Sequence, residues 1–263
     1  MVTRMTDKTT NSGTKSASGE NAGQIGLIGG AGLTVVNVYN QSKAPDGVHS
    51  GCAHVHAVSD EAYMVMDGSG YAEFHDLENG YRKMTLNKGD YVQFPPTVMH
   101  RLVSNGDLVV LCIMSSAGLP ESGDARIYFG PDADADPELF NHLVNLPFNK
   151  GLQGALERRD HSVRAYMDLI HLHETDRKAY FEELRRYVDT HCQAVAGHAD
   201  TFNLKVSQGP LAWAQTLRNR LAQLPGRPDI QLDVKVNRSE TGSNLGMCGI
   251  LRPMLTLTDL ESS

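Results

Sequence analysis

The segment GCAHVHAVSDEAYMVMDGSG, residues 51–70, places two histidines and a carboxylate within eight residues of one another. Its residues favour β-strand, in which positions i and i+2 point to the same face. His54 and His56 would then project together, and Glu61 would begin the next strand. Three nitrogen and oxygen donors on adjacent antiparallel strands suit a borderline divalent ion such as Fe(II), Mn(II), Ni(II) or Zn(II).

A fourth donor is expected in the segment GDYVQFPPTVMH, residues 89–100. A Gly-Asp turn leads into a strand, two prolines end that strand, and His100 follows a short bend. The joint occurrence of this histidine with the His-x-His pair and the glutamate is a more specific signal than either pattern alone.

Both segments resemble the two motifs of the cupin superfamily. The first motif is matched by the spacing of His54, His56, Glu61 and Gly68, and the second by the spacing of Gly89, Pro95 and His100. The chain departs from the second motif at two turn or strand-end positions, Thr97 and Ser104, and Gly51 lies closer to the first histidine than the family pattern asks.

The resemblance implies a mainly β fold, a small cupin-type β-barrel or jelly roll, with one divalent transition metal per chain in its mouth. Its ligands would be His54, His56, Glu61 and His100. Fe(II) is the favoured ion, and Mn, Ni or Zn are alternatives. Cupin relatives commonly form dimers, so a homodimer is expected.

Strand-length runs separated by turn residues extend from Ile25 to about Ser116, and helical periodicity follows. We expect a disordered arm at 1–24, the barrel at 25–118, a loop at 119–136 and a mostly helical region at 137–263. Leu211 to Pro225 reads as one helix and 230–236 as a strand. The Gly- and Ser-rich segment 238–249 is interpreted as a surface connection or as a loop that closes over the mouth.

Composition limits the class of protein. The chain has 263 residues, a net charge of −7 and four cysteines without a CxxC pair, and its helices are not notably basic. No apolar run approaches the roughly 20 residues that span a bilayer, and the first residues lack the apolar core of a signal peptide. We therefore expect no nucleic-acid partner, no membrane association and a cytoplasmic location.

Further residues are candidates for contact with a substrate. Tyr63 and Val65 share the strand face of Glu61, so Tyr63 is either a catalytic hydroxyl or a core aromatic. Leu102 would add an apolar wall two residues after His100. Gln93 and Arg126 are candidate substrate-binding residues, the latter because a guanidinium suits bidentate recognition of an anion.

Three hypotheses for the function follow. The first is an Fe(II)-dependent oxygenase that acts on a small organic acid, a diketone or a phenolic compound with O2. The second is a non-redox isomerase, epimerase or lyase, which would need an acid or base such as Tyr63. The third is a module that binds a small ligand without catalysis.

Overall fold

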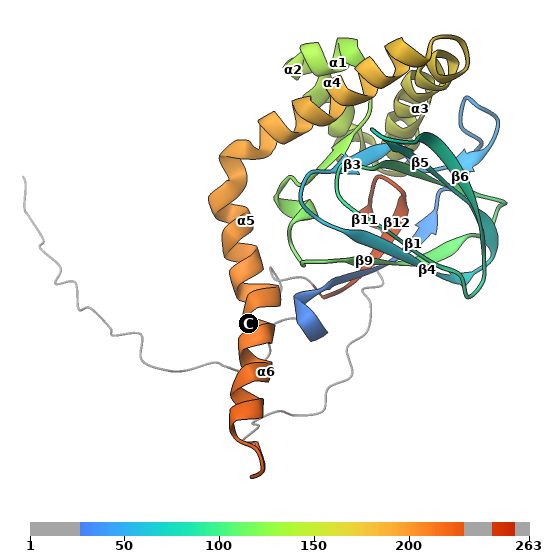
Figure 1. The fold of residues 1–263 in the computed structure, drawn as a ribbon. Coiled ribbons are helices and arrows are strands. Elements are labelled where there is room, and N and C mark those ends of the chain that lie inside the picture. Colours follow the sequence, from blue (N-terminus) through green and yellow to red (C-terminus); the bar gives the residue numbers. More distant parts are fainter. Residues whose placement is uncertain (1–26, 229–243, 256–263) are drawn as a thin grey trace, which may run out of the picture.

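Two antiparallel β-sheets face each other in the computed structural model, which describes residues 27–228 and 244–255 (Figure 1). The expected arm at 1–24 and the strand at 230–236 lie outside these residues. The first sheet has the strand order β11-β12-β1-β9-β4-β7. Its strands are β1 (Gly32–Val38), β4 (Glu61–Asp67), β7 (Tyr91–Phe94), β9 (Val109–Met114), β11 (Asn244–Leu245) and β12 (Gly249–Leu255).

The second sheet has the strand order β10-β3-β8-β5-β6, and β2 also pairs with β8. Its strands are β2 (His49–Ser50), β3 (His54–His56), β5 (Ser69–Asp76), β6 (Gly80–Asn87), β8 (Met99–Ser104) and β10 (Ala125–Ile127). The mainly β fold with a helical region after it is confirmed.

Apolar side chains from both sheets fill the space between them. The core cluster contains Val36, Val38, Tyr63, Val65, Ala72, Phe74, Leu86, Phe94, Val98, Leu102, Leu108, Val110, Cys112, Met114 and Cys248. Strand alternation explains this set, since every second residue of β1, β4 and β9 points inward. Burial of a leucine or valine of this kind contributes about 1.5–3 kcal/mol.

Four helices lie against the outside of the second sheet: α1 (Pro131–Ala135), α2 (Pro137–Val144), α3 (Leu146–Thr175) and α4 (Arg177–Val195). The Asp136 carboxylate caps α2 by accepting hydrogen bonds from the backbone N–H groups of Glu138 and Leu139. Tyr166 and Leu169 of α3 and Leu184 of α4 pack in one apolar cluster with residues of the sheet, among them Val55. The α3–α4 pair is thus an integral layer of the fold.

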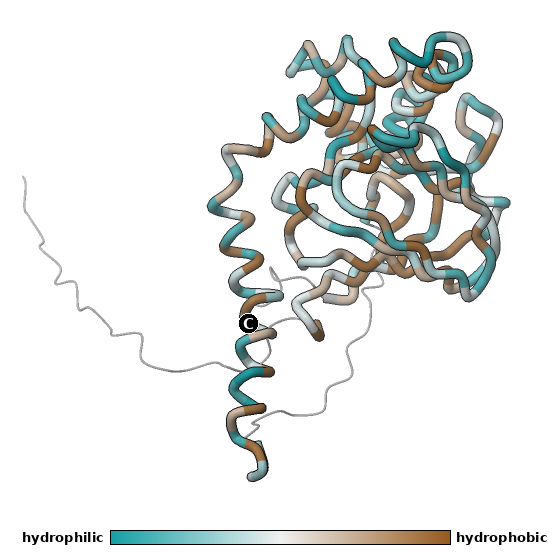
Figure 2. Tube along the Cα trace, viewed as in Figure 1, coloured by the Kyte–Doolittle hydropathy of each residue, from teal (hydrophilic) through white to brown (hydrophobic). Residues whose placement is uncertain are grey.

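A last helical stretch runs away from the barrel along one side (Figure 1). It comprises α5 (Ala199–Val206), the π-helical η4 (Ser207–Leu211) and α6 (Ala212–Ala222), and hydrophobic and hydrophilic residues alternate along it (Figure 2). The short helix η1 (Ile28–Gly30) meets it at η4. A Cβ on Gly30 would lie 2.3 Å from the backbone nitrogen of Pro210, so glycine permits this close approach.

Strands β10, β11 and β12 lie in regions where the sequence indicated a loop or helices. β10 falls within 119–136 and pairs with β3, and β12 pairs with β1 of the barrel. The C-terminal region therefore returns to the first sheet and extends it by two strands. Within the described part of the chain, no helix has both the length and the apolar character needed to cross a membrane.

Candidate metal centre

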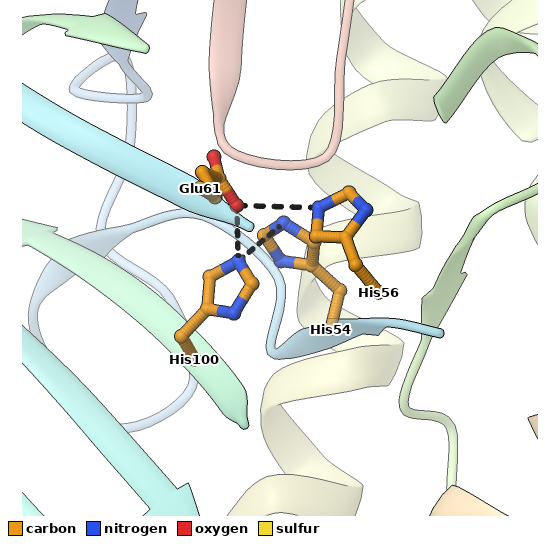
Figure 3. Close-up of side chains that lie close together, drawn as sticks. All are labelled: His54, His56, Glu61 and His100. Carbon is orange, nitrogen blue, oxygen red and sulfur yellow. Dashed lines mark hydrogen bonds and ion pairs between the residues drawn. The ribbon is translucent and has the colours of Figure 1, made fainter. Parts of the chain in front are cut away.

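Three strands bring the four predicted donors together inside the barrel. His54 and His56 lie on β3, Glu61 begins β4, and His100 on β8 is paired directly across from His54. All four side chains are at most 5% exposed, and their donor atoms lie within 4.8 Å of one another. The side chains converge on one point in Figure 3.

The donor spacing matches that of neighbouring ligands around one ion. The Nε2 atom of His100 lies 3.0 Å from that of His54 and 3.0 Å from Oε2 of Glu61. His56 Nε2 lies 3.2 Å from the same oxygen. Two donors that are each about 2.1 Å from an ion and at a right angle to one another are about 3.0 Å apart.

Backbone carbonyls fix the tautomers of two of these histidines. Nδ1 of His54 contacts the Cys52 carbonyl at 3.1 Å, and Nδ1 of His100 contacts the Val98 carbonyl at 2.9 Å. A carbonyl only accepts, so each Nδ1 carries a proton, and the Nε2 atoms of the two rings face each other. Oε2 of Glu61 lies within ion-pair distance of both His100 and His56. This group of donor atoms suits a positive charge, and these residues could hold a divalent ion.

Asp124 is a site residue that sequence reasoning missed. Its carboxylate is fully buried and lies 3.3 Å from Nδ1 of His56. It also accepts hydrogen bonds from the backbone N–H groups of Ala57, Val58 and Ser59. A carboxylate behind a ligating histidine orients the ring and raises its basicity. The available signal was weak, because an aspartate after glycine in a loop is common.

Burial and neighbouring charges set the protonation states of the site without an ion. Burial raises the pKa of Glu61, but His100 and His56 outweigh it and hold this pKa well below its usual range. Burial lowers the pKa of His56, but hydrogen bonding to Asp124 and Glu61 raises it to about 9. For Asp124, burial is outweighed by His56 and Ser59, which lower the pKa to about 2. A proton on His56 thus balances part of the negative charge of the Glu61 and Asp124 carboxylates, as a bound ion would.

The inward-facing candidates lie beside this cluster. Tyr63 is fully buried, its ring centre is 6.2 Å from that of His100, and its hydroxyl has no hydrogen-bond partner. Burial, followed by the charge of Glu61, raises its pKa well above the usual range, so the hydroxyl keeps its proton. Val65 and Leu102 belong to the apolar core of the same interior.

Gln93 and Arg126 lie away from the cluster. Gln93 is paired across the sheet with Ala62 rather than with Glu61, is exposed, and accepts a hydrogen bond from the Tyr91 hydroxyl. The Arg126 guanidinium donates to Asp134 at 2.6 Å and lies over the Phe140 ring. Its position opposite Val55 puts it on the outer face of the sheet.

The tip of the β11–β12 hairpin adds a thiol that the sequence pattern did not indicate. Cys248 is buried, and its Sγ lies 3.6 Å from Nε2 of His54. The hairpin, red in Figure 1, points its tip toward the four side chains in Figure 3. A second thiol, that of Cys112 on β9, donates to Oε1 of Glu61 at 2.9 Å.

Several contacts hold this hairpin in place. The backbone N–H of Cys52 donates to the Met247 carbonyl at 2.9 Å. The Gly246 carbonyl accepts hydrogen bonds from the Tyr39 hydroxyl at 2.8 Å and from the Arg158 guanidinium of α3 at 2.6 Å. A Cβ on Gly51 would lie 2.5 Å from Cα of Cys248, so glycine is needed where the hairpin passes the segment between β2 and β3. Helix α3 thereby supports the hairpin that lies over the site.

The protein is thus a β-barrel whose interior holds three histidines and a glutamate that could bind a metal ion. A family model described as "Cupin domain" matches residues 42–114, the stretch that contains all four donors. Residues 42–114 therefore form a cupin domain, and a helical region follows this domain.

Solved structures align with about a third of the chain. A cupin protein from Bacteroides fragilis is 22% identical over 34% of this chain and 68% of its own, with a TM-score of 0.26. The TDP-fucose-3,4-ketoisomerase WlaRA from Campylobacter jejuni is 13% identical over 35% and 64%, with a TM-score of 0.29. The capsular polysaccharide assembling protein CapF from Staphylococcus aureus is 19% identical over 36% and 26%, with a TM-score of 0.29. No curated protein matches the chain.

Proposed function

We propose that the protein is a metal-dependent enzyme of small-molecule metabolism, and that it is an Fe(II)-dependent oxygenase. The observation that carries the metal site is the spacing of 3.0–3.2 Å among the donor atoms of His54, His100, Glu61 and His56. Three imidazole nitrogens and one carboxylate oxygen form a donor set that suits iron and its first-row neighbours. Iron bound there would supply the capacity to activate dioxygen.

The residues around the site favour a small organic acid, diketone or phenolic substrate. Four protein donors leave room on a six-coordinate ion for a substrate oxygen. Val65 and Leu102 supply apolar surface that excludes water and strengthens polar contacts inside the barrel. The Tyr63 hydroxyl, which is protonated and unpartnered, is free to donate a hydrogen bond to a substrate oxygen.

Oxygen uptake tests the oxygenase. Protein loaded anaerobically with Fe(II) is mixed with small acids, diketones and catechols in an oxygen electrode, beside the Glu61→Gln variant. We expect one of these compounds to trigger O2 consumption by the wild type and not by the variant. Turnover of a compound at the same rate without oxygen would contradict the oxygenase.

A non-redox isomerase, epimerase or lyase is the second candidate. The specific observation in its favour is Tyr63, whose hydroxyl is positioned beside the donors without a partner and could act as an acid. Oxygen-independent turnover that is lost in Tyr63→Phe would support this candidate. Binding of small ligands without any turnover would instead indicate a non-catalytic module.

A further inference from the structure

The C-terminal hairpin places a soft donor at the metal site from outside the matched cupin domain. Cys248 is separated by 194 positions from His54, yet its Sγ lies 3.6 Å from the ring nitrogen that faces the other donors. Cys248 and Tyr63 belong to the same interior cluster.

We infer that Cys248 is a fifth protein ligand of the ion held by His54, His56, Glu61 and His100. The inference rests on the proposed metal site and deepens it. On binding, a bond forms between sulfur and the metal, and the thiol proton passes to solvent. No electron is transferred, so no oxidant or reductant is needed.

The distance agrees with shared coordination. An imidazole nitrogen lies about 2.1 Å from a metal such as zinc and a thiolate sulfur about 2.3 Å. With an angle between 90° and about 110° at the ion, the two donors are about 3.1–3.6 Å apart. The 3.6 Å between Cys248 Sγ and His54 Nε2 falls at the upper end of this range.

The backbone around Cys248 is fixed in a way that keeps its sulfur near the site. Met247 on one side is hydrogen-bonded through its carbonyl to Cys52. On the other side, a Cβ on Gly249 would lie 2.1 Å from the Asn37 carbonyl oxygen, so only glycine fits. A site whose support is rigid holds its donors more precisely than one on a free loop.

A thiolate would change the choice of metal. Soft sulfur donors favour zinc, iron and copper over manganese and magnesium. Cys248 would also occupy one of the two coordination positions that the other four ligands leave open. A six-coordinate ion could then not bind substrate and O2 at the same time. The simpler interpretation is a thiol that only donates a hydrogen bond to the His54 lone pair.

Cobalt(II) is the probe that separates these two interpretations, because a thiolate bound to it absorbs in the near ultraviolet whereas nitrogen and oxygen ligands do not. We expect this band in the wild-type Co(II) protein and its loss in Cys248→Ser, which should still bind Co(II). Cys112→Ser is the matched control, since the buried Cys112 thiol donates a hydrogen bond to Glu61, and this variant should keep the band. A band that survives Cys248→Ser would overturn the assignment.

X-ray absorption on the zinc-loaded wild type keeps the test independent of how the variants fold. A sulfur scatterer at about 2.3 Å is expected. A shell of nitrogen and oxygen alone would show that Cys248 is only a hydrogen-bonding thiol. If neither cobalt nor zinc binds the wild type, the proposed metal site fails as well, which is a different result from binding without sulfur.

Discussion

His54 and His100 face each other across β3 and β8 with their Nε2 atoms 3.0 Å apart, while a backbone carbonyl occupies the other nitrogen of each ring. The two rings cannot satisfy one another in their neutral forms, because neither Nε2 carries a hydrogen. Folding therefore brings together donor atoms that could hold a cation.

Asp124→Asn should weaken metal binding without removing it. The amide keeps the shape of the carboxylate but loses the charge that orients His56, and loss of such a partner typically costs about 10–100-fold in metal affinity. Titration with Zn(II) against a competing chelator measures this change. Asp134→Asn is the control, because Asp134 is buried and paired with Arg126 and Arg186 away from the cluster. Equal affinities in the two variants would argue against this role of Asp124.

Tyr63→Phe should lower turnover by about 100-fold and leave the metal content unchanged, because it removes only the unpartnered hydroxyl. Its stability should not fall, since a buried hydroxyl without a partner costs free energy. Steady-state kinetics and urea unfolding measure both effects. Tyr81→Phe is the control that should behave in the opposite way, because the Tyr81 hydroxyl donates to Glu73 away from the site. Full activity in Tyr63→Phe would remove the residue from the mechanism.

The donors that belong to short local sequence patterns could be predicted from the sequence. The site residues that depend on pairing between distant strands could not. Strand alternation predicted His54 with His56 and Glu61 with Tyr63 on inward faces, and all four side chains are buried in the structure. For Gln93 the alternation near two prolines gave no register, and its pairing with Ala62 decides that it is exposed.

The remaining site residues depend on contacts between distant segments. Asp124 reaches His56 because β10 pairs with β3, and Cys248 reaches His54 because β12 pairs with β1. Neither pairing leaves a local pattern, since register between distant strands is set by the packing of the whole sheet. The barrel motif was thus visible in the sequence, whereas the second set of contacts required the tertiary structure.

His75 should make the protein less stable in acid. It is fully buried, with one ring nitrogen 2.8 Å from the Tyr180 hydroxyl and the other 2.9 Å from that of Tyr166. Burial, then the charges of His173 and Arg101, lower its pKa to about 3. The unfolded chain binds a proton near pH 6.5, so stability due to this group is present above that pH and is lost toward pH 3, by up to about 1.4 kcal/mol per pH unit.

Urea unfolding of the wild type and His75→Gln between pH 4 and 7 checks this linkage. Glutamine can still donate and accept hydrogen bonds but does not titrate. The free energy of unfolding should fall more steeply with acidification in the wild type than in the variant. Identical slopes would mean that His75 takes up its proton equally in the folded and unfolded states.

Arg158→Met should loosen the hairpin over the site. The variant loses the hydrogen bonds from the guanidinium to the carbonyls of Leu245 and Gly246, while methionine retains much of the apolar stem. Hydrogen exchange should become faster for backbone amides at 246–249, and a bound ion should pass to a chelator more rapidly. Arg159→Met is the matched control, since Arg159 is equally buried but binds the carbonyl of Ser42 instead. Unchanged exchange at the hairpin in Arg158→Met would contradict this support.

The most direct test of the central claim is elemental analysis by mass spectrometry on protein purified without a metal-affinity tag and reconstituted with Fe(II). The account predicts one divalent transition-metal ion per chain in the wild type and its loss in Glu61→Gln, because that change removes the only carboxylate among the four donors. No bound metal in the wild type after reconstitution, or equal metal in both proteins, would contradict it.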